Sequence, residues 1–458
     1  MLAAANFDAD AFVALPGPAW LREARRSSWE LFARSPAPSE SDEIWRYSRI
    51  DELDLERYAP CPAAATEALG LADLPANVRD LVSAAGPAAT VLVSHNGGYG
   101  HVVRPQAGLE VHAVGGPPGR PNNGAADAVP DGAPATGPEA LTGELLPARA
   151  GPRADVWTAF NGAFARVRWT VRVAPGSALR APLVVVHWLD HEGGAIFPRL
   201  QVELGTGSSA LVVEVVASPE VDVLSVPVTE LRLARGARLG FGYVQLLGGQ
   251  AWQLGNQVSR VGAEAALRSM TYALGGSYAR VRTDSVLEGP GGDSELLAAY
   301  FGCADQMHDL RTVQYHAAPN SRSNLLFKGA VANRARSVYS GLIRVERGAR
   351  GTNAFQTNRN LVLSEGAQAD SVPNLEIEDN DVRCSHASAV GPIDESQLFY
   401  LESRGVPTRS AERLIALGFM DDVLGRFPVG GMRAWLRRAL VGKLDEAGLG
   451  AGPEGRQG

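Results

Sequence analysis

The sequence predicts a mainly β protein whose core is a solenoid of parallel strands, with helical segments before and after it. From about residue 155 to 382 the chain is a series of short, often alternating β-type runs, and no long helical stripe interrupts them. Small turn clusters recur in this region, several of them roughly 26–29 positions apart. A loose period of that size is typical of stacked coils that bury a shared core. The clusters lie at 235–237, 261–263, 291–293, 320–321, 347–349 and 365–367.

A β-sandwich is the competing architecture for the same region. Sandwiches favour tight hairpins with turns such as Asn-Gly, and these runs hold almost none. The parallel solenoid is therefore the favoured interpretation, and we expect it to occupy residues 154–390.

The N-terminal part, 1–111, is expected to be helical or mixed. Trp20, Ala24, Leu31 and Phe32 fall at helical spacing, which predicts an amphipathic helix. Residues 112–153 are rich in Gly, Pro and Ala. Because so few apolar side chains cannot offset the entropy of ordering, we expect a flexible insertion there.

Helical patterns return after Gly391 and predict a helical domain over 391–446. The first helix ends at Gly405, a natural left-handed C-cap, with Pro407 just beyond it. Two further helices follow, and the tail 447–458 is expected to be disordered.

The composition of the chain argues against several classes of function. The chain has 458 residues, of which 45% are hydrophobic and 20% charged, with a formal net charge of −7. These values are those of an ordinary globular protein and give no reason to expect nucleic acid as the main partner. No apolar run is long enough for a membrane span, and the N-terminus lacks the pattern of a secretory signal. Three scattered cysteines suit a reducing cytoplasm, where we expect the protein to lie.

The stretch Glu376–Gly405 holds the residues with the clearest chemical character. An acidic strand leads to Cys384 and His386, and Asp394 then caps a helix. Thiolate and imidazole are ligands for iron, zinc or copper, and alternate residues of a strand face the same side. A buried cysteine beside a solvated histidine explains the same spacing. Two ligands do not complete a metal site, so any metal needs further ligands from a partner chain or from distant residues.

The other histidines give weaker signals of a site, and several known functional motifs are absent from the sequence. His308 and His316 could approach Cys303 if one or two coils bring them together, although a structural role is the favoured interpretation. His187 and His191 flank Trp188 and are interpreted as surface or hydrogen-bonded residues. The chain has no G-x-x-x-x-G-K-[ST] loop, no C-x-x-C pair and no G-x-S-x-G elbow. It should therefore not hydrolyse ATP by itself.

The stretch from Val382 to Gly405, VRCSHASAVGPIDESQLFYLESRG, resembles the SufB/SufD family of Fe–S cluster assembly proteins. Within that family the chain is more similar to the SufD type, because it has Cys-Ser-His at 384–386 and no cysteine in the NLVLSEG segment from Asn360. The triplet Tyr339-Ser340-Gly341 is closer to the SufB type. The likeness is more diffuse over the solenoid region and slight over the N-terminal region.

The resemblance implies a right-handed parallel β-helix core between helical domains, and a non-catalytic scaffold role in a cytoplasmic complex. The implied partners are a SufB-type paralogue and a SufC-type ABC ATPase, with no nucleic acid and no membrane. A transient Fe–S cluster would be shared with the SufB-type partner, and the resemblance leaves a flavin open. It assigns His386 and, less firmly, Cys384 to the cluster interface. The implied ATPase dock lies in the helical segment, with Asp394, Glu395, Gln397, Leu398, Phe399, Tyr400, Arg404 and Gly405.

Two alternatives stay open from the sequence. One is the role of a SufB-type main scaffold, for which only Cys61, Cys303 and Cys384 could supply thiolates. The other is a carbohydrate-active β-helix enzyme, which usually presents several carboxylates along one groove and is secreted.

Overall fold

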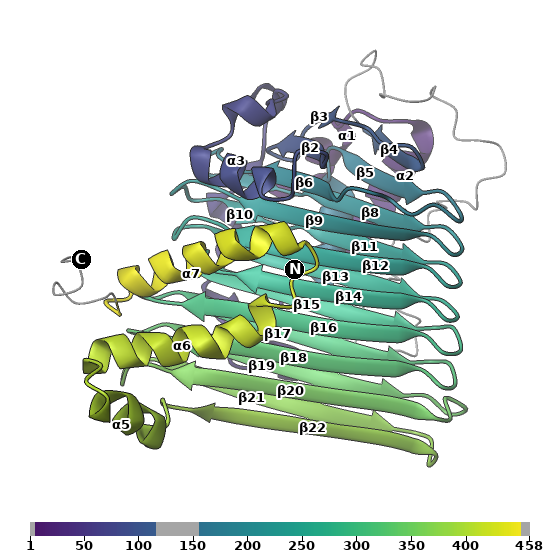
Figure 1. Ribbon diagram of the computed structural model, residues 1–458. Coiled ribbons are helices and arrows are strands. Elements are labelled where there is room, and N and C mark those ends of the chain that lie inside the picture. Colours follow the sequence, from purple (N-terminus) through teal and green to yellow (C-terminus); the bar gives the residue numbers. More distant parts are fainter. Residues whose placement is uncertain (1–4, 116–154, 450–458) are drawn as a thin grey trace.

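The chain forms a parallel β-solenoid with helices on two opposite sides (Figure 1). The computed structural model describes residues 5–115 and 155–449. In these residues the strands form a 12-stranded and a 10-stranded sheet, which we name sheet A and sheet B. The predicted mainly β solenoid with flanking helices is confirmed, and the alternative β-sandwich is wrong because successive coils pair in parallel.

The strands of sheet A follow the order β21-β19-β17-β15-β13-β11-β8-β5-β4, with β1, β7 and β10 off this path. They are β1 (Ala59–Pro60), β4 (Leu109–Val114), β5 (Arg168–Val173), β7 (Gly194–Ile196), β8 (Arg199–Leu204), β10 (Leu224–Ser225), β11 (Val228–Leu233), β13 (Trp252–Val261), β15 (Tyr278–Leu287), β17 (Met307–His316), β19 (Arg336–Val345) and β21 (Gln368–Ile377).

The strands of sheet B follow the order β22-β20-β18-β16-β14-β12-β9-β6-β2-β3. They are β2 (Thr90–His95), β3 (Gly100–Val103), β6 (Leu183–Trp188), β9 (Ser209–Ala217), β12 (Arg238–Leu246), β14 (Ala266–Ala273), β16 (Asp293–Gly302), β18 (Arg322–Val331), β20 (Thr352–Val362) and β22 (Val382–Gly391).

Regular register produces the period seen in the sequence. Tyr278 pairs with Met307 and Met307 with Arg336, so that 29 residues separate each from the next. Only the first-coil pairs β2–β3 and β4–β5 are antiparallel among the described strands. Strands β2 and β4 precede residue 154, the expected start of the solenoid, and each extends one of the two sheets. Of the expected insertion and tail, residues 116–153 and 450–458 lie outside the described residues.

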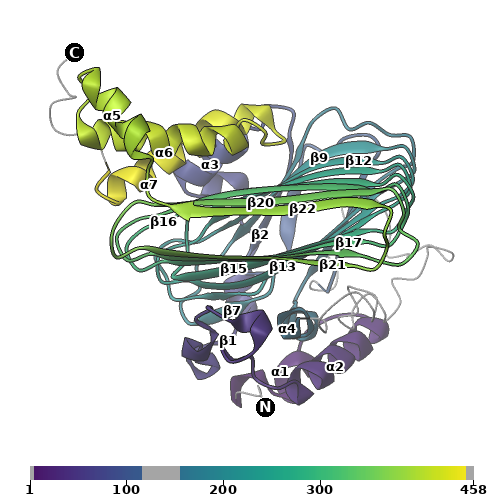
Figure 2. The ribbon, with the colours of Figure 1, turned by 90° about the horizontal axis from the view of Figure 1, so that it is seen from below.

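Helices cover the outer face of each sheet, as the view along the solenoid shows (Figure 2). The N-terminal group packs on sheet A, apart from the helix over 76–83, which packs on sheet B together with the C-terminal group. The helices are α1 (Ala9–Val13), α2 (Ala19–Arg34), α3 (Ala76–Ser83), α4 (Val156–Phe164), α5 (Glu395–Ser403), α6 (Thr408–Leu424) and α7 (Arg433–Glu446). No helix within 5–115 or 155–449 combines the length and apolar character needed to cross a bilayer.

The three largest apolar clusters of the described residues hold these layers together. The first fills the solenoid lumen, the space enclosed between the two sheets. The second joins sheet B to the C-terminal helices, where the Tyr272 hydroxyl donates to the Leu436 carbonyl at 2.7 Å. The third joins sheet A to the N-terminal helices, where the Phe32 and Phe160 rings stack at 4.3 Å. Burial of this apolar surface fixes both helical groups on the solenoid.

Candidate functional site at the open end of the solenoid

Cys384 and His386 lie on β22, the last strand of sheet B. In the register of the parallel pair β20–β22, Cys384 is opposite Ala354 and His386 is opposite Gln356. Ala354 and Gln356 are buried and face the lumen, and side chains at paired positions of neighbouring strands point to the same side of a sheet. The two candidate ligands therefore face the lumen at the open end of the solenoid.

The two candidate ligands differ in their surroundings. Cys384 is a half-buried free thiol, and burial raises its pKa above the ordinary value. At neutral pH it is therefore a thiol, and a metal ion would have to displace its proton. His386 is exposed and has no hydrogen-bond partner among the described residues.

The acidic run before the pair is engaged in structural contacts. Arg344 contacts Glu376 at 3.1 Å and Glu378 at 3.3 Å. Asp379 accepts hydrogen bonds from the backbone amides of Gly348 and Asp381, which hold its pKa below the ordinary value. These carboxylates fix the turns and strand ends of the last coils.

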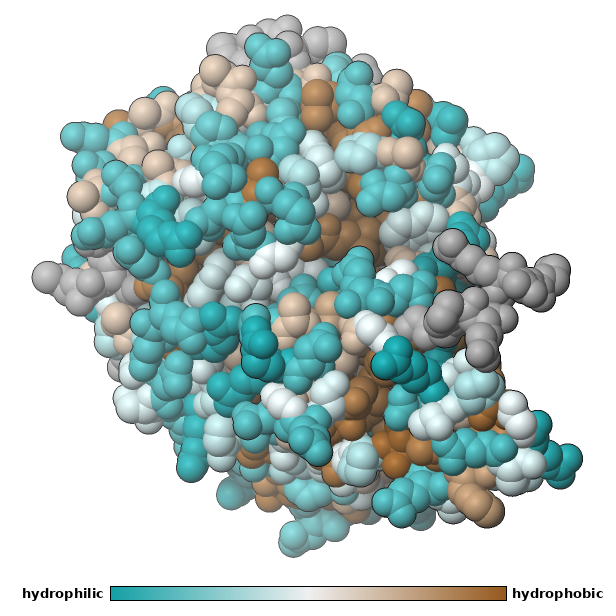
Figure 3. Space-filling model, turned by 90° about the vertical axis from the view of Figure 1, so that its left-hand side faces the viewer, coloured by the Kyte–Doolittle hydropathy of each residue, from teal (hydrophilic) through white to brown (hydrophobic). Residues whose placement is uncertain are grey.

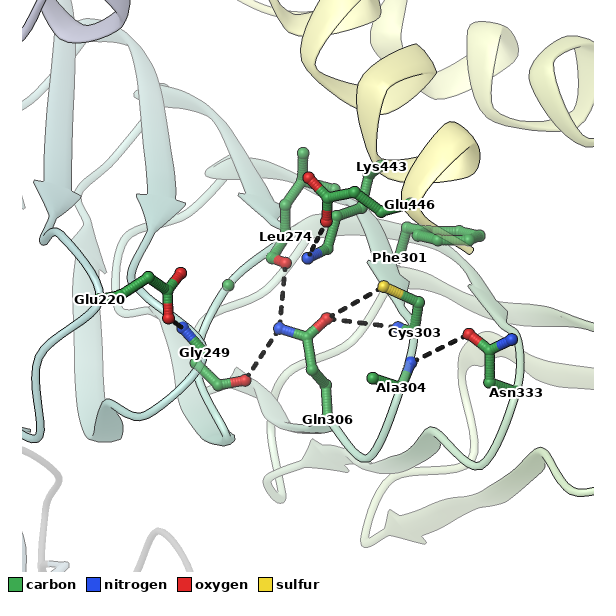
Figure 4. Close-up of polar contacts among 12 residues, drawn as sticks. Glu220, Gly249, Leu274, Phe301, Cys303, Ala304, Gln306, Asn333, Lys443 and Glu446 are labelled. Carbon is green, nitrogen blue, oxygen red and sulfur yellow. Dashed lines mark hydrogen bonds and ion pairs between the residues drawn. The ribbon is translucent and has the colours of Figure 1, made fainter. Parts of the chain in front are cut away.

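The other two cysteines are buried elsewhere. Burial raises the pKa of Cys61 to about 12. Cys303 lies where α7 approaches the solenoid, beside Gln306 and close to Lys443 (Figure 4). Burial raises the Cys303 pKa as well, so neither thiol is accessible as a thiolate.

The histidines that the sequence singled out do not converge on Cys303. His308 contacts the Phe301 carbonyl at 3.2 Å, and His316 lies between the Ser321 and Ser323 hydroxyls at 2.7 and 2.8 Å. Both are buried in the lumen, and their structural role is the one that the sequence favoured.

His187 and the aspartate near it in the sequence, Asp190, have different partners. His187 points into the lumen, where its Nε2 lies 3.3 Å from Glu214 Oε1, so its interpretation as a surface residue is wrong. Asp190 instead contacts His95 at 2.7 Å and accepts from the Trp188 indole. Within the described residues, no group of three or more His, Cys, Asp or Glu side chains could hold a metal ion. Cys384 and His386 are thus two candidate ligands without a third among the described residues of their own chain.

Helix α5 follows β22 directly and exposes its apolar side chains. Asp394 caps it by accepting from the amides of Ser396 and Gln397. No residue of α5 is buried, and Phe399 and Tyr400 are 71% and 58% exposed. Figure 3 views the side of the molecule on which α5 lies in Figure 1, where hydrophobic areas interrupt a mainly hydrophilic surface.

The other residues of the expected docking segment lie within α5 or directly after it. The Arg404 guanidinium lies 5.2 Å from the Tyr400 ring centre, and Gly405 has φ +82°, as its predicted left-handed position requires. Glu395 and Gln397 are exposed in the first turn, and Leu398 is only partly buried.

Two residues with a place in this site were missed from the sequence. Gln356 lies in the lumen beside His386, and Lys328 holds α6 on β18. The sequence contains a signal for Gln356, because Gln356, Asn358 and Asn360 occupy alternate positions and place polar side chains on the buried face of a strand. No local pattern marks Lys328, whose partners are about 90 positions away.

Comparison with known proteins relates the chain to one family. The family model described as "SUF system FeS cluster assembly, SufBD core domain" matches residues 187–419, about half of the chain. An iron-sulfur cluster assembly SufBD family protein of Mycobacterium tuberculosis is 42% identical over 195 residues, which cover 41% of this chain and 49% of the relative.

Two proteins named SufD are also similar. The Bacillus subtilis protein is 35% identical over 157 residues, covering 34% of this chain and 36% of its own length. The Escherichia coli protein is 34% identical over 160 residues, covering 35% and 38%. The chain thus spans about half the length of the mycobacterial relative and less of the two SufD proteins. With the match to the core-domain model, the chain belongs to the SufBD family of iron–sulfur cluster assembly proteins.

Proposed function

We propose that the chain is a SufD-type, non-catalytic subunit of a SUF scaffold for Fe–S cluster assembly. The observation that carries the proposal is the position of Cys384 and His386 at the open end of the solenoid, with only two ligands in the described chain. A nascent cluster is the cargo of such a site, and a SufB-type paralogue would supply the remaining ligands.

The open end supports pairing with another solenoid. Among the described strands, β21 pairs only with β19 and β22 only with β20, so each keeps one free edge. Val372, Ile377 and Val390 are exposed along these two strands. A free edge with apolar side chains is a ready template for added strands. A paralogue with the same fold would continue both sheets and bring its own ligands to His386.

The cysteine environments favour the SufD role over that of a SufB-type main scaffold. Cys61 and Cys303 are buried with raised pKa values, so Cys384 is the accessible thiol of the three. A cluster built mainly on one chain needs several thiolates. A shared cluster needs only one or two groups from this subunit.

Helix α5 and the start of α6 form the proposed dock for a SufC-type ABC ATPase. The exposed Phe399 and Tyr400, together with Leu414 on α6, give an apolar surface directly after the ligand strand. Buried aromatic residues often dominate protein interfaces. Through this dock, ATP-driven movement of the partner would reach β22.

Co-expression with a SufB-type paralogue and a SufC-type ATPase tests the proposal. The wild type, His386→Ala and the control His101→Ala, an exposed histidine on β3, should all co-purify with both partners. We expect His386→Ala to lower the bound iron and sulfide about tenfold, and His101→Ala to leave them unchanged. Equal cluster content in His386→Ala would refute the ligand role, and failure of the wild type to co-purify would refute the scaffold role.

A further inference from the structure

Gln356 and His386 are neighbours on the lumen face of sheet B, and the residue opposite Gln356 is a glycine, Gly341. A Cβ atom on Gly341 would lie 2.2 Å from Gln356 Nε2, so the glycine makes room for the amide. The residue paired with Gly341 on β21, one coil nearer the open end, is Pro373. Glycine and proline side chains offer no hydrogen-bonding group, so neither can serve as a partner for Gln356 or His386.

Gln356 is buried without a partner. It is 1% exposed, and neither its Oε1 nor its Nε2 has a hydrogen bond. The nearby Tyr339 hydroxyl is already paired with Thr312 Oγ1 at 3.0 Å. A buried amide with both polar atoms unpaired is costly, and such a group in a native fold calls for a specific explanation.

We propose that Gln356 is a positioning residue for His386, an inference that rests on the proposed function. Neighbouring strands lie about 4.8 Å apart, so rotation of the Gln356 side chain alone brings its amide to the imidazole. Gln356 Oε1 accepts a hydrogen bond from one ring N–H of His386. The other ring nitrogen then keeps its lone pair and faces the open end, where the cargo and the partner lie.

This arrangement follows the chemistry of histidine ligands. A ligating imidazole usually donates its second ring nitrogen to an oxygen, which fixes the tautomer and the orientation of the ring. His386 is exposed and free of such a partner among the described residues, and Gln356 is the buried acceptor beside it. One contact thus pairs Gln356 Oε1 with a ring N–H of His386.

The test is the tautomer of His386 in the isolated full-length chain. The chain is labelled with ¹⁵N-histidine and studied at about pH 8.5, where an ordinary imidazole is neutral. The His386 signals are those lost in His386→Ala. We expect one dominant tautomer in the wild type, and a change of about fivefold in the tautomer ratio in Gln356→Leu, the usual net effect of one hydrogen bond. Gln356→Glu keeps an oxygen acceptor and should retain the wild-type tautomer.

Ser371→Ala is the matched control, because Ser371 on β21 also carries an unpaired buried polar atom near the open end. It should leave the His386 signals unchanged. A wild-type tautomer ratio in a folded Gln356→Leu chain would overturn the proposal, as would a change caused by Ser371→Ala alone. If Gln356→Leu does not fold, Gln356→Met carries the same expectation. Since the readout needs no cluster and no partner, its failure is distinct from failure of the scaffold role.

Discussion

The Lys328 ammonium on β18 contacts the Asp422 carboxylate on α6 at 2.8 Å. It also donates to the Phe419 carbonyl at 3.1 Å and lies 4.6 Å from the centre of the Phe419 ring. The Lys328 side chain is 9% exposed, so this contact is shielded from water on the lysine side. Strand β18 pairs with β20, which pairs with β22. Helix α6, whose start belongs to the proposed dock, is therefore attached to sheet B two strands away from the strand of His386.

The first prediction concerns this contact. In Lys328→Met the stem still packs, but Asp422 and the Phe419 carbonyl lose their donor. We expect the free energy of unfolding to fall by about 1–2 kcal/mol, as for a charged hydrogen bond at a partly exposed site. Urea denaturation measures the change. The control Arg235→Met removes an ion pair exposed on both sides and should change stability by less than about 0.5 kcal/mol. Equal effects of the two variants would contradict the assigned role of Lys328.

The solenoid could be predicted from the sequence because its cause is local and repeated. Turns recur at similar intervals from coil to coil, and parallel register converts that spacing into stacked strands. The helices after Gly391 could also be predicted, because their apolar spacing and the stop at Gly405 are local features of the sequence. Cys384 and His386 share one face, as the alternation of a strand requires.

What the sequence could not predict depends on contacts between distant segments. Leu398 and Phe399 are apolar, yet no residue of α5 is buried. Trp20 and Leu31 fit the helical spacing of α2 but are exposed, whereas Ala24 and Phe32 are buried. Helical spacing identifies an apolar side, but the surface that covers it belongs to the tertiary structure or to a partner.

A second prediction concerns two glycines at the joint between sheet B and the C-terminal helices. A Cβ atom on Gly242 of β12 would lie 2.6 Å from the Phe427 ring, whereas one on Gly418 of α6 would meet nothing within 4 Å. Gly242→Ala should therefore cost about 1–3 kcal/mol through overpacking. Gly418→Ala should stabilise the helix by about 0.5–1 kcal/mol. Thermal and urea unfolding of both variants give the two signs, and a neutral Gly242→Ala would show that Phe427 moves freely.

The buried histidines His308 and His316 predict a loss of stability in mild acid. Burial lowers both pKa values from 6.5 to about 4. Between these pH values the unfolded chain binds more protons than the folded chain, so stability falls as the pH decreases through this window. From pH 7 to about 4.5 each histidine should remove about 2–3 kcal/mol.

Urea unfolding at several pH values measures this slope in the wild type and in the double variant His308→Gln/His316→Gln. The variant is expected to be less stable at pH 7, because His316 loses its contacts with two serines. Its stability should nevertheless depend less steeply on pH, because carboxylate protonation is common to both proteins. Parallel slopes would mean that the two imidazoles do not contribute.

The final prediction separates docking from folding at α5. Phe399 and Tyr400 contribute little to the fold because both side chains are exposed and no residue of α5 is buried. The double variant Phe399→Ala/Tyr400→Ala should unfold within about 0.5 kcal/mol of the wild type. If these rings are the anchors of the ATPase dock, the same variant should bind the SufC-type partner at least about thirtyfold more weakly, since anchor residues typically cost 2 kcal/mol or more on truncation. Calorimetry measures the affinity, and pairing with the SufB-type paralogue should persist because β21 and β22 are untouched. Unchanged ATPase affinity would move the dock away from α5, whereas loss of both partners would show that α5 also supports the open end of the solenoid.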